Sequence, residues 1–517
     1  MACGVSFTIA TAARAAEAPR AEHVVIVIWD GLRPDSVNEH DTPILFKLAA
    51  GGTTFTNHHC VYVSSTEVNG AALATGGYPH STGIMANSEF RPDIDPLKPF
   101  NTESEAAVRN GDELTRGHYL GLPTVAEIIQ RNGGRTVVAG TKPVALLADR
   151  SERSEGSMSP MLYQGRTLPR SLATMLAKSY GEFPKAANSK VAANRAADAW
   201  TTRSLTESLW AAGVPQFSVL WLSEPDYAQH GSGPNSAVAR DALKSSDQNL
   251  ARVLEALDRA KARETTAVFV VSDHGFSTIG RSIDTAALLN DAGFHAFHTL
   301  PESPVTGSVV VVANGGTVGL YVVGRDKRTI QRLVDFFEQS DFAGVIFCRF
   351  TIEGTFPLSA AEIDTPAAPD IVVALRWSAD KSKTGLPGMI ACDSSKLVVG
   401  QGMHATLSRF DMHNTLIAAG AGIRSRYKDE LPSGNADVAP TVLALLGITP
   451  SAEMDGRPLD EALAQRAAPA ESPVIETLKA THRGDKTEWN QYLRRTKLGR
   501  QIYLDEGNGE ATPVEKR

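Results

Sequence analysis

Cysteine is scarce in this chain, with only four residues of this type among 517. They are Cys3, Cys60, Cys348 and Cys392. Cysteines this few and this widely separated exclude a disulfide scaffold and a CxxC metal site. Cys348 and Cys392 could form one bridge in an oxidising compartment. The default expectation is that both are unpaired, buried thiols.

The sequence also lacks a long apolar run and a strong net charge. No stretch reaches the roughly 18 apolar residues that a membrane span requires, so we expect no membrane span. The net charge of −7 is modest for this length and provides no basic footprint for duplex nucleic acid. A phosphate-bearing substrate would therefore have to be held by local charges at its site.

The N-terminal segment is rich in small residues. It ends in Ala16-Glu17-Ala18, which resembles the A-x-A pattern of a signal peptidase site, although a basic start is missing. We therefore expect residues 1–18 to be a signal peptide and the mature protein to be periplasmic or secreted. A disordered, Ala-rich tail is the alternative interpretation.

Apolar strands alternate with amphipathic helices over much of the chain. We expect strands at residues 23–29, 136–139, 217–222 and 266–272, and helices at residues 42–50, 66–76, 192–211 and 234–263. Continuous apolar strands separated by helices indicate a parallel sheet covered on both faces. The predicted fold class is therefore α/β, a doubly wound and mostly parallel sheet flanked by helices.

The alternation breaks between residues 282 and 396, which we expect to form an inserted α+β cap. This segment contains strand-like pieces at residues 307–314, 319–323 and 370–375 and a helical stretch at 327–339. A strand at 415–418 and a capped helix at 437–446 resume the earlier pattern. We therefore assign residues 19–281 and 397–466 to the catalytic core. Residues 467–517 are polar and are expected to wrap the surface as a C-terminal tail.

Short motifs place carboxylates and imidazoles just after the expected strands. They contain Asp30, Asp226, His230, Asp273 and His274, and a later Gly-Met-His motif adds His404. Because ligands of open α/β sheets bind outside the carboxyl ends of the strands, these side chains should meet on one rim. The i, i+4 spacing of Asp226 and His230 directs both toward one centre if the segment is helical.

Three Asp and three His are the oxygen and nitrogen donors that two Zn²⁺ ions accept, although other divalent transition metals are possible. Taken alone, each motif has a structural explanation, since an Asp before Gly is a common turn residue. His413 is a rival to His404, whereas the adjacent His58 and His59 lack a carboxylate in their motif. The joint occurrence of the motifs favours the metal site.

The order of the motifs resembles the nucleotide pyrophosphatase/phosphodiesterase branch of the alkaline phosphatase superfamily. The motifs are, in order, the Asp30-Gly31 pair, Thr66 with Asn69, TGGYPHSTGI, EPDYAQH, SDHG and GMH. The similarity extends over residues 23 to 465. The resemblance implies that Thr66 is the nucleophile and that Asn69 donates to a phosphoryl oxygen. It also implies one zinc held by Asp226, His230 and His404, and another held by Asp30, Asp273, His274 and Thr66.

These residue types suit a metal-assisted displacement at phosphorus. A threonine hydroxyl is a poor nucleophile, so coordination to Zn²⁺ is the plausible activation. Two ions roughly 4 Å apart can hold both the attacking and the leaving oxygen. We therefore predict a zinc-dependent hydrolase of small phosphate diesters that acts through a covalent phospho-threonine.

Alternatives within the same superfamily are a phosphonoacetate hydrolase, which would take a phosphonate substrate with the same seven side chains, and a phosphomonoesterase. A non-catalytic metal-binding module is a weaker alternative, because it would keep Thr66 and six ligands for no chemical reason.

Three positions depart from the family pattern. Glu67 and Val68 follow Thr66 where an aromatic residue and a proline are usual, and Ala405 replaces the common Gly after His404. An acid beside the phosphate would repel a second negative charge, which favours diesters unless the Glu67 carboxylate turns to solvent. Lys142 and Arg150 are candidates for contact with a substrate anion, but we interpret them as solvated surface charges.

Overall fold

The computed structural model describes residues 20–514 except 152, 154, 185–189, 395, 452 and 486. The signal peptide expected at residues 1–18 lies outside this range. Within it, no helix is both long and apolar enough to cross a bilayer. Cys348 and Cys392 are buried free thiols, so the bridge considered for them is not formed.

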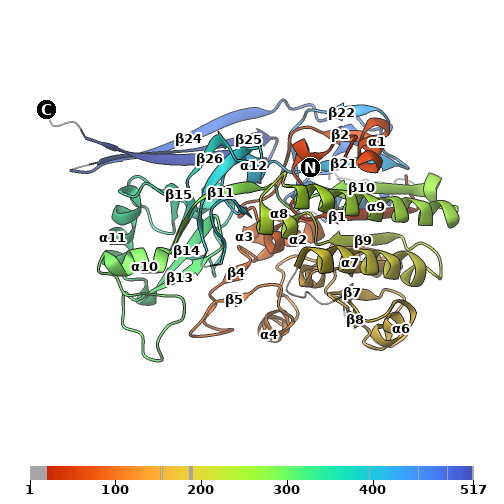
Figure 1. The fold of residues 1–517 in the computed structure, drawn as a ribbon, viewed down its shortest axis with the longest axis horizontal. Helices are drawn as coiled ribbons and strands as arrows, with labels where there is room; N and C mark the ends of the chain where they lie inside the picture. Colours follow the sequence, from red (N-terminus) through yellow and green to blue (C-terminus); the bar gives the residue numbers. More distant parts are fainter. Residues whose placement is uncertain are drawn as a thin grey trace, which may run out of the picture.

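A nine-stranded sheet forms the centre of the larger half of the molecule, with the strand order β22-β2-β21-β10-β1-β9-β6-β7-β8 (Figure 1). Its four central strands are β10 (Thr266–Val271), β1 (His23–Trp29), β9 (Phe217–Leu222) and β6 (Thr136–Gly140). These four run parallel to one another. They read as unbroken apolar runs because both of their faces are covered. The predicted mostly parallel α/β sheet is confirmed.

Helices cover both faces of this sheet. Strand β1 shows the division, because Val25 and Val27 pack into one apolar cluster and Val24 and Ile26 into the other. The first cluster is covered by α1 (Pro43–Gly51), α7 (Lys190–Arg203) and α9 (Ala237–Arg259), the second by α2 (Thr66–Thr75), α5 (Val125–Arg131) and α13 (Asn435–Leu445). The expected 192–211 helix is α7 followed by a π-helical segment, Ser204–Leu209.

The remaining elements of this half are short. The sheet is completed by β2 (Thr53–Phe55), β7 (Met161–Tyr163), β8 (Arg166–Leu168), β21 (Leu416–Gly420) and β22 (Tyr427–Asp429). Around it lie β3 (His58–His59), α3 (Pro79–Thr82), β4 (Ser88–Glu89), β5 (Phe100–Asn101), α4 (Glu105–Thr115), α6 (Ser171–Tyr180), α8 (Asp226–Ser232), α12 (Arg409–Met412) and β23 (Ser433–Gly434). Strand β21 runs antiparallel to β10, so the sheet is mixed at this side.

An α+β cap forms the other end of the molecule (Figure 1). Its six-stranded sheet contains β12 (Ala296–Phe297), β13 (Val309–Ala313), β14 (Thr317–Val322), β17 (Ile371–Leu375), β15 (Ala343–Cys348) and β16 (Phe356–Pro357). Helices α10 (Thr285–Asp291) and α11 (Lys327–Glu338) contribute to its apolar cluster. A four-stranded sheet of β18 (Trp377–Lys381), β19 (Pro387–Asp393), β11 (Ser277–Ile283) and β20 (Gly402–Met403) joins cap and core. The expected inserted cap is confirmed.

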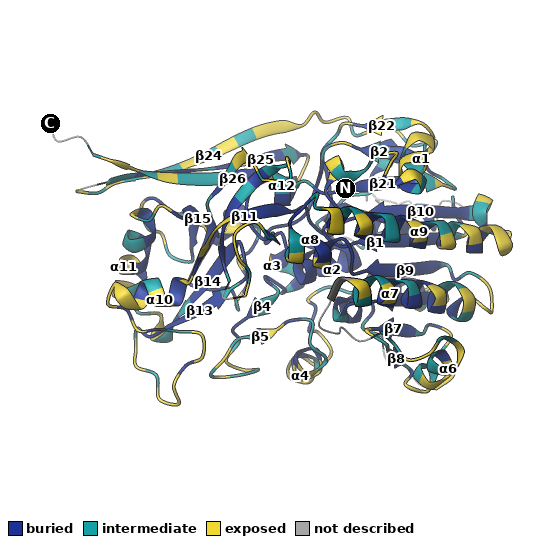
Figure 2. Cartoon of the chain, viewed as in Figure 1, coloured by how far each residue is buried: buried dark blue, intermediate teal, exposed yellow. Residues whose placement is uncertain are grey.

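The C-terminal segment forms a three-stranded antiparallel sheet, which the sequence analysis did not anticipate. It contains β24 (Val474–Arg483), β25 (Thr487–Leu498) and β26 (Gln501–Pro513). Trp489, Gln491 and Leu493 alternate along β25 and are buried, which is the two-residue period of a strand. The charged residues Glu488, Arg494 and Arg495 flank this segment and obscure the period in the sequence. Figure 2 shows that β24 is largely exposed, whereas parts of β25 and β26 are buried.

Candidate active site

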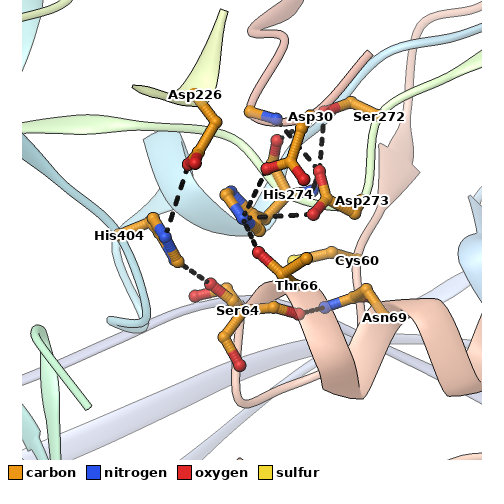
Figure 3. Close-up of polar contacts among 12 residues, drawn as sticks. Asp30, Cys60, Ser64, Thr66, Asn69, Asp226, Ser272, Asp273, His274 and His404 are labelled. Atoms are coloured by element: carbon orange, nitrogen blue, oxygen red, sulfur yellow. Dashed lines mark hydrogen bonds and ion pairs between the residues drawn. The ribbon is translucent and has the colours of Figure 1, made fainter. Parts of the chain in front are cut away.

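Six buried or half-buried carboxylate and imidazole side chains meet at the carboxyl ends of the central strands. Figure 3 labels Asp30, Asp226, Asp273, His274 and His404 among them. Asp30 follows β1, and Asp273 and His274 follow β10. Asp226 is the first residue of α8, just after β9, and His230 lies one turn later on the same helix. His404 follows β20. The structure therefore brings all six ligands expected from the sequence to one rim of the sheet.

The six side chains form two adjacent groups. In the first, Asp226, His230 and His404 each place one ligand atom within 4.8 Å of the others, and Asp30, Asp273 and His274 do the same in the second. The shortest contacts are 3.2 Å from His230 Nε2 to Asp226 Oδ1 and 3.3 Å from His274 Nε2 to Asp273 Oδ2. The rings of His274 and His404 stack with their centroids 3.7 Å apart, so the two groups are neighbours.

All three imidazoles present the same nitrogen to the site. The Nδ1 atoms of His230, His274 and His404 lie 3.0, 2.8 and 2.9 Å from the carbonyl oxygens of Gly402, Gly275 and Ser64. Because a carbonyl oxygen only accepts, each Nδ1 carries the hydrogen and donates it. In a neutral ring the lone pair is then on Nε2, which faces the carboxylates. This is the usual outer-shell arrangement for a metal-binding histidine.

Each carboxylate has one oxygen bound by protein donors and one left free. Asp30 Oδ2 accepts from Trp221 Nε1 at 2.8 Å and from Lys142 Nζ at 2.9 Å, and Lys142 Nζ also donates to Asp226 Oδ2 at 3.1 Å. Asp273 Oδ1 accepts from a backbone amide beside Asp30 at 3.0 Å. The opposite oxygens are buried and have no hydrogen-bond partner among the described residues. Such oxygens facing nitrogen lone pairs fit bound cations, because burying them unpaired is costly.

Burial keeps the imidazoles of His274 and His404 in the form that binds a metal, whereas at His230 the Asp226 carboxylate outweighs burial and raises the pKa. Burial lowers the pKa of His274 to about 4, and it lowers the pKa of His404 well below its usual range. Both rings are therefore neutral at neutral pH. Burial raises the pKa of Asp30 to about 6, partly opposed by Lys142. The pKa of Asp226 stays well below its usual value, because Lys142 and His230 outweigh the opposing effect of burial.

Thr66 is the first residue of α2, at the edge of the second ligand group. Its side chain is buried, and Oγ1 lies 3.3 Å from His274 Nε2. Figure 3 shows its hydroxyl directed at the ligand cluster from the end of the helix. The free backbone amides of a helix N-terminus favour an anion at this position. The geometry therefore combines a hydroxyl, two candidate metal positions and an anion-binding helix end.

Asn69 is fully engaged by the loop that precedes Thr66. Its Nδ2 donates to the carbonyl oxygens of Val61 and Ser65 at 3.1 and 3.0 Å. Its Oδ1 accepts from the Val61 amide at 2.8 Å and from Asn435 Nδ2 at 3.0 Å. The phosphoryl contact expected from the sequence would require these buried hydrogen bonds to break.

Asn87 occupies a position that the sequence analysis missed. Its Oδ1 accepts from the Glu67 amide at 3.2 Å, which places the side chain against the first turn of α2. Its Nδ2 has no hydrogen bond to any residue that the structure describes, and the residue is half-buried. The sequence contained one signal for Asn87, since this side-chain amide lies three residues after Ile84, where the TGGYPHSTGI motif ends.

Lys142 is buried, so its interpretation as a solvated surface charge was wrong. The side chain lies between Asp30 and Asp226, with Nζ 4.9 Å from the centre of the Tyr227 ring. Although burial alone would lower the pKa of Lys142, the carboxylates of Asp226 and Asp30 raise it well above its usual value. Arg150 instead pairs with Asp112. The burial of Lys142 depends on β6 lying beside β9. This pairing joins segments that are distant in the sequence, so local sequence patterns do not indicate the burial.

Glu67 turns inward rather than to solvent. It is 3% exposed, and its Oε2 has no hydrogen-bond partner within the described part of the chain. Burial and the neighbouring Glu103 raise the pKa of Glu67 well above its usual range. A neutral carboxyl would not repel a phosphate, so the sequence argument for diesters is weaker in this environment.

The rival histidines lie outside the two groups. Both ring nitrogens of His58 are used, by Ser433 Oγ at 2.9 Å and Asn435 Oδ1 at 3.0 Å. His413 lies against His59, with ring centroids 4.3 Å apart, and is not part of the His404 group.

A cavity of about 880 Å³ opens beside the first ligand group. Tyr227, His230 and Met403 line it on one side, and His298 and Val311 of the cap line it on the other. A cavity of this size accommodates a small organic ligand. The cap therefore contributes directly to the space next to the candidate metal ligands.

Comparisons with known proteins identify relatives among phosphodiesterases and phosphatases. Venom phosphodiesterase of Naja atra is 22% identical over 260 residues, which are 50% of this chain and 26% of that protein. Alkaline phosphatase PafA of Elizabethkingia meningoseptica is 23% identical over 264 residues, 48% of this chain and 46% of that protein. The chain thus spans between a quarter and a half of the length of these curated relatives.

Solved structures support the fold. Human ectonucleotide pyrophosphatase/phosphodiesterase 5 matches with a TM-score of 0.58 and 16% identity, covering 86% of this chain and 100% of that chain. The murine protein matches with a TM-score of 0.57 and 17% identity, covering 83% and 96%. The family model described as type I phosphodiesterase / nucleotide pyrophosphatase matches residues 24–339, which is more than half of the chain. The chain therefore belongs to this family, within the alkaline phosphatase superfamily.

Proposed function

We propose that this protein hydrolyses small phosphate diesters of the nucleotide pyrophosphatase/phosphodiesterase type, with Thr66 as the nucleophile. The observation that carries the proposal is the set of three buried Asp oxygens without partners opposite three imidazole Nε2 atoms, next to the Thr66 hydroxyl. This arrangement matches the donor preference of Zn²⁺ and leaves the hydroxyl beside the metal positions.

The residues that would hold the two zinc ions form the groups already described. Asp226, His230 and His404 would bind one ion, and Asp30, Asp273, His274 and Thr66 the other. Bound zinc would ionise the nucleophile and water and stabilise the leaving oxygen. The Nδ1 hydrogen bonds to backbone carbonyls would fix the tautomer and the orientation of the imidazoles for this role.

The protein's own groups then account for the displacement. Thr66 Oγ1 attacks phosphorus, the bond to the leaving alkoxide breaks, and a phospho-threonine forms until water hydrolyses it. Backbone amides at the start of α2 and the free Nδ2 of Asn87 stabilise the phosphoryl oxygens. Asn69 acts as a positioning residue, since it holds the loop before Thr66 through its buried hydrogen bonds.

The printed names of related proteins support the reaction class. Bis(5'-adenosyl)-triphosphatase of Xenopus laevis is 23% identical over 300 residues. An inactive threonine-to-alanine variant of murine ectonucleotide pyrophosphatase/phosphodiesterase 5 was solved in complex with AMP. A threonine essential for activity and a nucleotide ligand in that protein are consistent with Thr66 as nucleophile and with a nucleotide-like diester substrate here.

A phosphomonoesterase is the second candidate, and Lys142 is the observation that favours it. Its buried ammonium group contacts one Asp of each ligand group and could balance the second charge of a monoester. The relative named alkaline phosphatase PafA is consistent with a phosphomonoesterase activity. Phosphonoacetate, which also carries two acidic groups, is a third candidate substrate.

One rate comparison separates these candidates. We expect kcat/KM for bis(p-nitrophenyl) phosphate to exceed the values for p-nitrophenyl phosphate and phosphonoacetate, measured in parallel with zinc-loaded protein. A monoester or phosphonoacetate rate far above the diester rate would overturn the diesterase assignment.

We also infer a periplasmic or secreted location from residues 1–18. Recovery of the full-length product only from the cytosolic fraction would contradict this location.

A further inference from the structure

A second histidine cluster lies away from the candidate active site. It contains His59 of β3, His413 directly after α12, and Asp505 of β26. One potential ligand atom of each residue lies within 4.8 Å of the other two. The three segments come from distant parts of the sequence, and Figure 1 shows β26 passing beside α12. The cluster therefore lies where the C-terminal sheet meets the core.

His59 shows the same hydrogen-bond pattern as the three histidines of the active site. Its Nδ1 lies 3.0 Å from the carbonyl oxygen of Ser433, so Nδ1 carries the hydrogen and donates it. The Nε2 of the neutral ring then has a lone pair, and it lies 3.0 Å from Asp505 Oδ1. Two acceptors at this distance require a cation between them, either a proton or a metal ion.

His413 favours the metal ion. Its ring centroid lies 4.3 Å from that of His59, and neither ring nitrogen has a hydrogen bond within the described part of the chain. A proton shared by His59 and Asp505 would not engage His413. A metal ion would engage all three side chains.

The backbone of β26 is adapted to aim Asp505 at this cluster. Arg494 pairs with Glu506 and Arg495 pairs with Leu504, so Asp505 is the extra residue of a β-bulge. Bulges commonly redirect a side chain. The Thr496 hydroxyl donates to Asp505 Oδ2 at 3.0 Å and fixes the carboxylate. A local break in strand pairing thus coincides with the one carboxylate of the cluster.

We propose that His59, His413 and Asp505 bind a third divalent transition-metal ion, of the Zn²⁺ class, that fastens the C-terminal sheet to the core. Tetrahedral zinc with bonds of roughly 2.0–2.1 Å separates its ligand atoms by roughly 3.3 Å, close to the observed spacing of His59 and Asp505. Water completes the coordination, because the Asp505 side chain is 13% exposed.

The ion has a structural role that reaches the active site. His413 directly follows α12. In this helix the carbonyl oxygens of Asp411 and Phe410 accept from the amides of Gly275 and Phe276 at 2.8 Å each. Those two residues directly follow His274, a ligand of the proposed catalytic pair. Fixing His413 therefore fixes the segment that supports the His274 loop.

Metal content of variants tests the proposal. We expect His413→Gln and Asp505→Asn to bind one zinc per chain fewer than the unchanged protein after equilibration in a zinc buffer and elemental analysis. His482→Gln is the matched control, because His482 Nδ1 also joins the C-terminal sheet to a carboxylate, Glu338 Oε2 at 2.5 Å, outside the cluster. It should retain full zinc content. Equal zinc content in all of these proteins would overturn the proposal.

Two further measurements keep this site distinct from the catalytic pair. Asp226→Asn should lose zinc from the active site but keep the zinc bound by His59, His413 and Asp505. Failure of one site can therefore be distinguished from failure of the other. Crystals of the unchanged, zinc-loaded protein should show an anomalous peak between His59, His413 and Asp505 at the zinc absorption edge. A map with no peak there would mean that only a proton joins His59 to Asp505, and the proposal would fail.

Discussion

His404 donates a hydrogen bond from Nδ1 to the carbonyl oxygen of Ser64 at 2.9 Å. Ser64 precedes Thr66 by two residues, so a candidate metal ligand directly holds the loop that presents the nucleophile. The Ser64 hydroxyl in turn donates to the carbonyl oxygen of Thr406 at 2.7 Å. These reciprocal contacts couple the position of Thr66 to the first ligand group, although its hydroxyl lies beside the second.

Replacement of Thr66 tests the nucleophile. We expect Thr66→Ala to reduce kcat by a factor on the order of 10⁴ or more, because it removes the hydroxyl proposed to form the covalent intermediate. Zinc content should be largely retained, since three protein ligands remain at each ion. Thr66→Ser is the control and should keep measurable turnover. Activity of Thr66→Ala near that of the unchanged protein would remove the nucleophile assignment.

Asn69 and Asn87 should respond differently to truncation. Asn69→Ala removes several buried hydrogen bonds, so we expect a loss of unfolding free energy of about 2–3 kcal/mol. Asn87→Ala should leave stability within about 0.5 kcal/mol but lower kcat/KM for a diester by roughly 10- to 100-fold. Denaturant unfolding and diester kinetics measure the two effects. The assignment fails if Asn69→Ala is stable and Asn87→Ala fully active.

Lys142 should discriminate between singly and doubly charged substrates. We expect Lys142→Gln to lower kcat/KM for a monoester at least tenfold more than for a diester, because its ammonium group faces both ligand groups. Arg150→Gln is the matched control, since Arg150 pairs with Asp112 and should leave this ratio unchanged. Equal losses for both substrates would show that Lys142 supports only the structure of the site.

Zinc affinity should weaken as the solution becomes acidic. The pKa of Asp30, raised to about 6 mainly by burial, means that protons compete with the metal for this ligand below about pH 6. His274, whose burial lowers its pKa to about 4, contributes only under more acidic conditions. Competition with a zinc indicator at pH 5, 6 and 7 should show apparent affinity falling toward pH 5. A constant affinity over this range contradicts the expectation.

The candidate metal ligands could be predicted because each lies in a short motif, most of them directly after a strand. Asp30 follows an unbroken apolar run, and Asp273 and His274 follow another, so local patterns and the rule for α/β sheets were sufficient. The sheet and the cap were predictable for the same reason, since their strands are continuous apolar segments.

Features that depend on contacts between distant segments could not be predicted. Lys142 is polar and flanked by ordinary loop residues, and only the pairing of β6 with β9 buries it against Asp226. His59 was set aside because no carboxylate lies near it in sequence, yet Asp505, 446 residues away, supplies one. The sheet containing Asp505 was missed because charged residues hide its two-residue period.

The ammonium group of Lys142 also has a consequence for folding. It lies between Asp30 and Asp226 and neutralises part of their negative charge. Two buried carboxylates without a cation between them would repel each other and carry a large desolvation cost. The lysine therefore helps the polypeptide close this end of the sheet.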